Sequence, residues 1–173
     1  MKHLVSALAA AAVVNFSTAS NAATSLPAVI AVSAAVTSSC LVTALPLSFG
    51  TYKATDGADT LATTTVAVLC TGTTTATINL DHGLSPSGTT RRMSFGTTDK
   101  LNYSLFQPVS GVAGAACAYT VPFADGIGGF GAGLPISGVL ITPLNWNVCG
   151  SVPAGQNSPI GAYLDTVQVT VTF

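Results

Sequence analysis

TVQVTVTF, residues 166–173, indicates the fold class most clearly, because polar and apolar side chains alternate along it without a break. Successive side chains of an extended strand point to opposite faces. One face therefore carries Val167, Val169, Val171 and Phe173, while threonine and glutamine occupy the other. The stretch predicts a β-strand whose end is either recognised by a partner or paired in a definite register with another chain.

The same alternation recurs along most of the chain. We predict strands at 26–36, 47–52, 63–70, 75–80, 91–95, 101–106, 139–142, 144–148 and 166–173. Residues 109–138 are rich in glycine and alanine and are left unassigned. Many short strands with threonine on their outer faces indicate an all-β chain folded as a β-sandwich.

The first 22 residues have the composition of a secretory signal peptide. A short basic start precedes the alanine-rich apolar run 4–14, and small residues surround Ala22. The run is too short to span a bilayer, and a buried N-terminal helix is the less favoured alternative. We therefore expect cleavage near Ala22 and export of the remainder, which is long enough for one domain.

Charge is scarce in this chain. Charged residues make up 6% of it, with 5 lysines and arginines, 6 aspartates and no glutamate. This composition excludes a basic groove for nucleic acid and a polybasic membrane patch. It also gives little electrostatic protection against association. We expect a chain that is covered by partners or that polymerises.

Four cysteines lie beyond the expected cleavage site, at Cys40, Cys70, Cys117 and Cys149. An even number in an exported chain is typical of disulfides, and four cysteines permit three pairings. We favour the sequential pattern, Cys40 with Cys70 and Cys117 with Cys149, although the sequence leaves the second pair open. The absence of a C-x-x-C pair and the single remaining histidine argue against a metal site.

The candidate catalytic patterns are weak. His82 follows Asp81, but Asp-His-Gly is a turn composition and the chain contains no G-x-S-x-G elbow. The glycine run 126–131 lacks the lysine and the strand–helix context of a phosphate loop. We predict no catalytic residue and no cofactor, and we interpret Trp146 as a core residue rather than a sugar-binding platform.

Residues 23–37 form an uncharged segment in front of Cys40, and alternation places Ile30, Val32, Ala34 and Val36 on one of its faces. Two interpretations stay open. The segment is either the first strand of its own sandwich or a strand donated to a neighbour, because exposed uncharged strands are normally avoided unless they pair.

Several stretches in order resemble the spore coat protein U domain family, which includes subunits of archaic, Csu-type chaperone–usher pili. The resemblance covers nearly all of the chain after residue 22, and the ordered set is more specific than any one motif. The stretches are VTSSC (36–40), LSFGTY (47–52), TVAVLCT (65–71), RRM (91–93), LNYSL (101–105), VPAGQ (152–156) and GAYLDTVQVTVTF (161–173).

The resemblance implies an incomplete immunoglobulin-like β-sandwich, residues 38–173, completed by a donated strand. It implies a disulfide between Cys40 and Cys70, and it makes residues 23–37 the donor strand, with Ile30, Val32, Ala34 and Val36 as the inserted side chains. The strand ending at Phe173 would border the groove. The implied partners are neighbouring pilin subunits, a periplasmic chaperone and an outer-membrane usher, in a surface fibre that supports adhesion and biofilm formation.

Two places depart from the family pattern. Cys117 lies in the glycine-rich stretch 109–138, and Cys149 precedes the VPAGQ motif. A disulfide between them is consistent with both departures, and the glycine-rich loop is either a connector or an adhesive surface. A self-contained secreted coat or adhesive binding module therefore stays as the alternative to a polymerising pilus subunit.

Overall fold

The computed structural model describes residues 30–173 and divides the chain into two units, 1–35 and 36–173. The expected signal peptide and residues 23–29 lie outside the described part. Residues 30–39 belong to no strand, and all ten are exposed. The strands described below all belong to the second unit.

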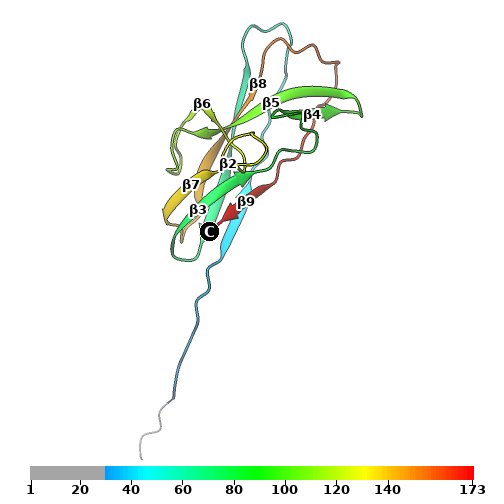
Figure 1. Ribbon diagram of the computed structural model, residues 1–173. Coiled ribbons are helices and arrows are strands. Elements are labelled where there is room, and N and C mark those ends of the chain that lie inside the picture. Colours follow the sequence, from blue (N-terminus) through cyan, green and yellow to red (C-terminus); the bar gives the residue numbers. More distant parts are fainter. Residues whose placement is uncertain (1–29) are drawn as a thin grey trace, which may run out of the picture. The chain divides into compact units, whose positions relative to one another are not determined.

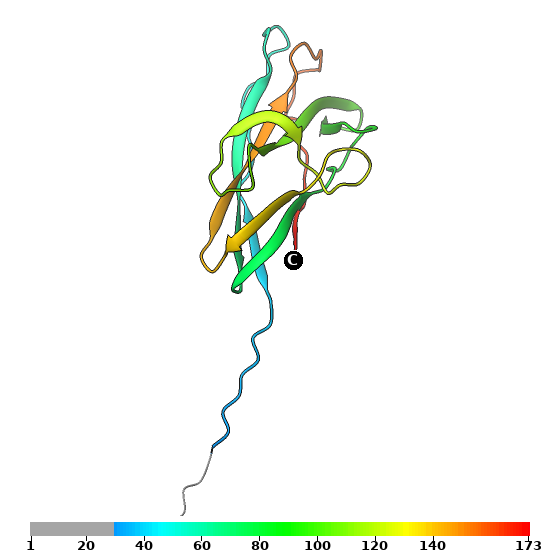
Figure 2. The same cartoon turned by 60° about the vertical axis from the view of Figure 1, so that its left-hand side comes forward.

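The described part of the chain folds into two antiparallel sheets (Figures 1 and 2). The larger sheet has the order β1-β2-β8-β5-β4, with β6 paired to β5, and the smaller has the order β7-β3-β9. The strands are β1 (Cys40–Ala44), β2 (Thr60–Cys70), β3 (Thr73–Leu80), β4 (Arg91–Phe95), β5 (Asp99–Pro108), β6 (Cys117–Pro122), β7 (Leu134–Val139), β8 (Leu144–Val152) and β9 (Val169–Thr172).

The core lies between the two sheets and follows the alternation in the sequence. Val66, Val68 and Cys70 of β2 are buried, while the residues between them are only partly covered. The second sheet contributes Ala76, Ile78 and Leu80 of β3 in the same way. Burying a larger apolar side chain contributes roughly 1.5–3 kcal/mol each. The predicted all-β sandwich is therefore confirmed.

Two predicted strands are not formed in the described residues. Residues 30–36 of the predicted strand 26–36 have no paired neighbour, and residues 47–52 also lie outside any strand. In the second case Gly50 turns the chain with a φ of 66°. Leu47 and Phe49 nevertheless pack against the core, because they are held by side-chain contacts rather than by a ladder.

Three strands were not predicted. These are β1, β6 and β7, of which the last two fall in or at the end of the glycine-rich stretch. The predicted strand 139–142 is wrong, since β7 ends at Val139. The pairing of β7 with β3 places Ile136 opposite Ala76 in the core, and local composition does not reveal this tertiary contact.

Two disulfides fasten the larger sheet, and they follow the sequential pattern. Cys40 and Cys70 are directly opposite each other in the pairing of β1 with β2. Cys117 of β6 is bonded to Cys149 of β8, although β6 pairs with β5. The second bridge therefore links β6 covalently to β8, in addition to the pairing of β6 with β5. In the described part of the chain, no helix is long and apolar enough to cross a membrane.

Candidate functional site

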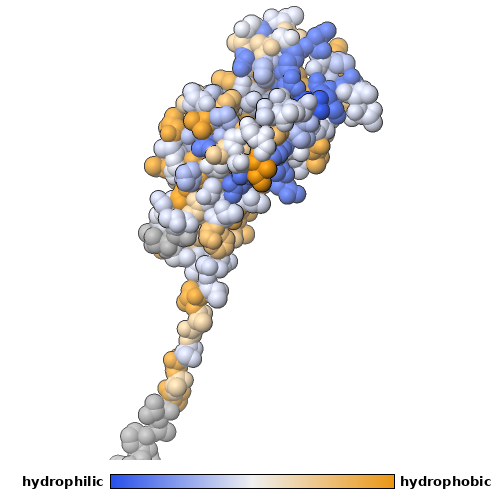
Figure 3. Space-filling model, viewed as in Figure 1, coloured by the Kyte–Doolittle hydropathy of each residue, from blue (hydrophilic) through white to orange (hydrophobic). Residues whose placement is uncertain are grey.

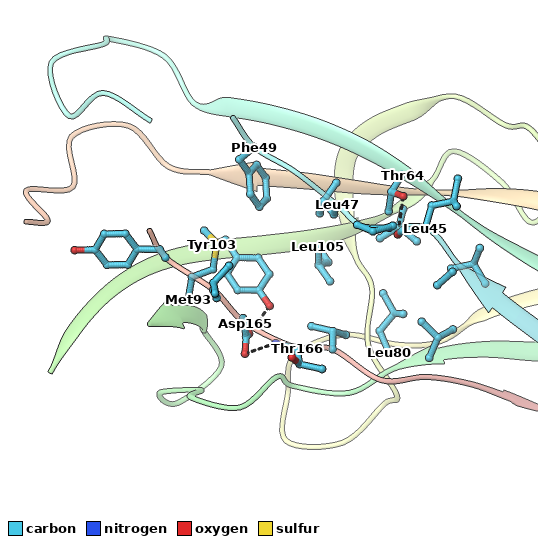
Figure 4. Close-up of a pocket in the computed structure, with 18 residues that line it drawn as sticks. Leu45, Leu47, Phe49, Thr64, Leu80, Met93, Tyr103, Leu105, Asp165 and Thr166 are labelled. Atoms are coloured by element: carbon cyan, nitrogen blue, oxygen red, sulfur yellow. Dashed lines mark hydrogen bonds between the residues drawn. The ribbon is translucent and has the colours of Figure 1, made fainter. Parts of the chain in front are cut away.

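An open groove lies along one side of the sandwich, where the two sheets end. β1 is the outermost strand of the larger sheet and β9 of the smaller, so each leaves one backbone edge unpaired. Between the segment that follows β1 and the segment that precedes β9 is a cavity of about 540 Å³ (Figure 4). The groove is thus bordered by two chain segments that continue from edge strands of different sheets.

The floor of the groove is the hydrophobic core itself. Buried side chains from four strands reach it, namely Val66, Leu80, Tyr103, Leu105 and Val148. One wall follows β1 and the other precedes or begins β9. The first wall consists of Ala44, Leu45, Pro46, Leu47 and Phe49, and the second of Tyr163, Leu164, Asp165, Thr166, Val167 and Val169. Core side chains are therefore accessible from the surface along this line.

Apolar side chains on both walls pack against the core and are only half-buried. They are Leu47 and Phe49 on one side and Tyr163, Val167 and Val169 on the other. A sandwich with a strand in this position would cover them from outside. The groove therefore offers incompletely covered apolar side chains next to the unpaired edges of β1 and β9, which is the combination that an added β-strand uses.

The predicted groove-edge residues are only partly brought together here. Val167 and Val169 line the groove, and Val171 packs against the core from the same face of β9. Phe173 is 58% exposed and does not line the groove. Pairing of β9 with β3 begins only at Val169, so residues 166–168 of the predicted strand lie before it.

The predicted donor side chains are exposed. Ile30, Val32 and Val36 are 85%, 91% and 83% exposed, and Ala34 is exposed as well. In Figure 3 the described residues of this segment are pale to orange, with none strongly hydrophilic. The segment therefore presents an apolar face of its own.

Sequence reasoning missed the polar end of the groove. Tyr103 rises from β5 and donates a hydrogen bond of 2.6 Å from its hydroxyl to Oδ2 of Asp165 (Figure 4). Oδ1 of Asp165 accepts bonds from the backbone N–H of Leu84 at 2.8 Å and of Thr166 at 2.9 Å. The available signal was that Asp165 is the only charged residue within GAYLDTVQVTVTF.

Arg91 lies beneath this end and is 3% exposed. Its guanidinium donates to the carbonyls of Leu80, the last residue of β3, and of Asp81, which follows it. Burial lowers the pKa of Arg91, while Tyr103 and three nearby aspartates oppose that shift. The side chain therefore holds two backbone carbonyls rather than serving as a surface charge.

The pKa of Tyr103 is raised from 10.0, first because burial disfavours the phenolate and then because the hydroxyl is bonded to Asp165. Because the pKa of Tyr103 is higher in the folded than in the unfolded protein, the protonated hydroxyl stabilises the folded state. This contribution is fully present below the pKa of the unfolded protein and is lost as the pH rises above it. From pH 10 upward, the free energy of unfolding should fall more steeply in the parent than in Tyr103→Phe, by about 1.4 kcal/mol per pH unit.

Urea denaturation of both proteins at intervals from pH 8 to 11 measures this difference. The other three tyrosines are present in both proteins, so their titration cancels. Parallel slopes for the two proteins would contradict the assignment of a buried, neutral Tyr103.

The other residues considered in the sequence analysis, His82 and Trp146, do not line the groove. His82 pairs with Asp125 at 3.0 Å rather than with Asp81, and its ring stacks on Phe130. The pair fastens the glycine-rich loop to the sandwich. Trp146 is a core residue, 2% exposed, as predicted. Among residues 30–173, no group of three or more histidines, cysteines or acidic residues is placed to hold a metal ion.

The comparisons with known proteins agree with this architecture. The model of the Spore Coat Protein U domain matches residues 26–170. Protein U of Myxococcus xanthus is 38% identical over 139 residues, which are 73% of this chain and 71% of that protein.

A solved structure also resembles the described fold. It is the chaperone–tip adhesion subunit pre-assembly complex, CsuC–CsuE, from the archaic chaperone–usher Csu pili of Acinetobacter baumannii. The TM-score is 0.53 at 22% identity, over 80% of this chain and 40% of the matched chain. This likeness concerns the fold, and it agrees with the predicted immunoglobulin-like sandwich. Because the domain model covers most of the sequence and the Myxococcus relative is similar over most of its length, the chain belongs to the Spore Coat Protein U domain family.

Proposed function

We propose that this protein is a structural subunit of an exported surface fibre and that it polymerises by strand donation. Residues 23–37 of one copy would fill the groove of the next. The observation that carries the proposal is the groove, whose floor is the hydrophobic core and whose walls are the segments after β1 and before β9, next to the unpaired edges of these two strands. The exposed segment with an apolar face supplies a strand of matching chemistry.

Insertion is favourable on two grounds. Backbone groups of the donated strand would pair with the free edges beside the groove, which gives affinity without a specific side-chain sequence. Ile30, Val32 and Val36 would move from water onto the core, at roughly 1.5–3 kcal/mol for each such side chain. Together these terms reach several kcal/mol before ordering of the segment is subtracted.

The path of the chain favours donation to another copy. Residues 38–39 connect the segment to β1 at Cys40, and β1 contacts β9 within the same copy. The groove is lined from Ala44 onward and by none of residues 40–43. A segment folding back beside β1 would therefore meet β9 before it reached the groove.

Export and assembly partners follow from the same chemistry. A subunit with an uncovered core is prone to aggregate, so a periplasmic chaperone that covers the groove before assembly is the expected first partner. An outer-membrane usher and neighbouring subunits, identical or related, are the later ones. We propose the cell surface as the location, after removal of residues 1–22, and adhesion and biofilm formation as the role of the fibre.

The test compares three chains produced in the periplasm. They are residues 23–173, residues 38–173, and residues 38–173 with residues 23–37 attached after Phe173 by a short flexible linker. We expect heat-stable polymers from the first, an unstable or aggregating second, and a stable monomer from the third, as read by size-exclusion chromatography and electron microscopy.

A fourth chain, with the attached segment shuffled in sequence, controls for the added length. If residues 38–173 alone form a stable monomer that binds no 23–37 peptide, strand donation is refuted. A self-contained coat or adhesive module would then be the better description.

A further inference from the structure

Residues 164–168 carry the chain from one sheet to the other beside the groove. Leu164 exchanges backbone hydrogen bonds of 2.8 and 3.0 Å with Ser94 of β4, which belongs to the larger sheet. Val169 then begins β9 in the smaller sheet. Between these points the backbone has left one ladder without entering the next, so its N–H groups need other acceptors.

Two aspartates supply those acceptors. Asp165 accepts from the N–H of Thr166 and, across the loop, from that of Leu84. Asp81 accepts from the N–H of Gln168 at 2.9 Å, and its own N–H donates to the Gln168 carbonyl at 3.0 Å. Both carboxylates therefore tie the crossing segment to the loop that follows β3.

The same carboxylate of Asp165 also reaches the groove. Its second oxygen accepts the hydroxyl proton of Tyr103, which stands on the groove floor, and both residues line the cavity. Arg91 holds the carbonyl of Asp81 from below. The second wall of the groove is thus connected through Asp165 to β5 and to the loop after β3.

Gly83 shows that the loop is fitted closely to this carboxylate. A Cβ atom at Gly83 would collide with Oδ2 of Asp165, and the φ of 75° at this position already favours glycine. The loop approaches Asp165 at a distance that no other residue type permits. This close approach is what brings the Leu84 N–H within 2.8 Å of the carboxylate.

We propose that Asp165 is a positioning residue that holds the second wall in place and so keeps the groove open for the inserted strand. The proposal rests on the strand-donation function proposed above. Val167 and Val169 are half-buried apolar residues beside an uncovered core. Without the Asp165 hydrogen bonds, they would shift over the floor to reduce its exposure to water, and they would occupy the space that the donated strand needs.

The test uses Asp165→Ala, which removes both acceptor oxygens, in the chain of residues 23–173, kept dilute and monomeric. Asp59→Ala is the matched control, since Asp59 accepts bonds of 3.0 Å from the Ser151 hydroxyl and the Ala154 N–H but does not line the groove. The first measurement is the rate at which a fluorescent peptide of residues 23–37 is taken up. The second is hydrogen exchange at the amides of Leu84 and Thr166.

We expect Asp165→Ala to slow peptide uptake at least tenfold relative to the parent and to Asp59→Ala, and to accelerate exchange at both amides. When the peptide is instead attached after Phe173, the groove is already filled. Asp165→Ala and Asp59→Ala should then unfold at similar denaturant concentrations, which separates positioning from general destabilisation.

Uptake by Asp165→Ala as fast as by the Asp59→Ala control would overturn the positioning role. A parent that takes up no peptide would refute strand donation itself. In that event the exchange measurement still tests whether Asp165 holds the second wall. Unchanged exchange at the amides of Leu84 and Thr166 would overturn this role independently of strand donation.

Discussion

Val32→Asp is expected to abolish polymer formation by the chain of residues 23–173. The alternation of the segment places Val32 among the side chains that would enter the groove, whose floor is the hydrophobic core. A carboxylate buried there without a partner costs several kcal/mol, and each 1.4 kcal/mol is a tenfold change in affinity. We therefore expect insertion to be weakened by about a hundredfold or more.

Ser33→Asp is the control for this prediction, because residue 33 occupies the opposite face of the same strand. It adds the same charge to the same segment but leaves the apolar face intact. Size-exclusion chromatography of both variants, with the parent alongside, measures polymer yield. Equal loss of polymer in the two variants would show that the segment does not bind by one apolar face.

Trp146→Ala is expected to have the largest effect on the stability of the sandwich. Trp146 lies on β8 opposite Val66 and is 2% exposed. Its indole N–H donates a hydrogen bond of 2.9 Å to the carbonyl of Gly111. Removal of a buried tryptophan side chain costs about 3–5 kcal/mol. That loss is a large part of the roughly 5–15 kcal/mol by which a domain is stable.

The measurement is urea denaturation of the monomer that carries residues 23–37 after Phe173, because its groove is filled and its unfolding is not obscured by polymerisation. Ile160→Ala is the control, since Ile160 is fully exposed and truncation there should change stability by less than about 0.5 kcal/mol. Comparable shifts for the two variants would contradict the position of Trp146 in the core.

The fold class followed from local alternation, and this worked best where a strand is buried on one face. In β2, β3 and β5 the apolar residues at every second position are the ones that the structure buries, as in Leu101, Tyr103 and Leu105. The same rule failed at residues 47–52, whose apolar side chains contact the core without a paired strand. Periodicity reports which side chains face the core, but it does not report whether a neighbouring backbone is present to pair.

Residue types and their order were enough to predict the all-β class, the family and the apolar faces of residues 30–36 and 167–173. The sequential disulfide pattern was predicted, but the sequence did not decide among the three possible pairings. The tertiary structure alone places β1 and β9 at the ends of different sheets on one side, and it brings Tyr103 to Asp165 and Asp81 to Gln168. These contacts join residues far apart in the chain, and neither alternation nor local composition carries information about such distances.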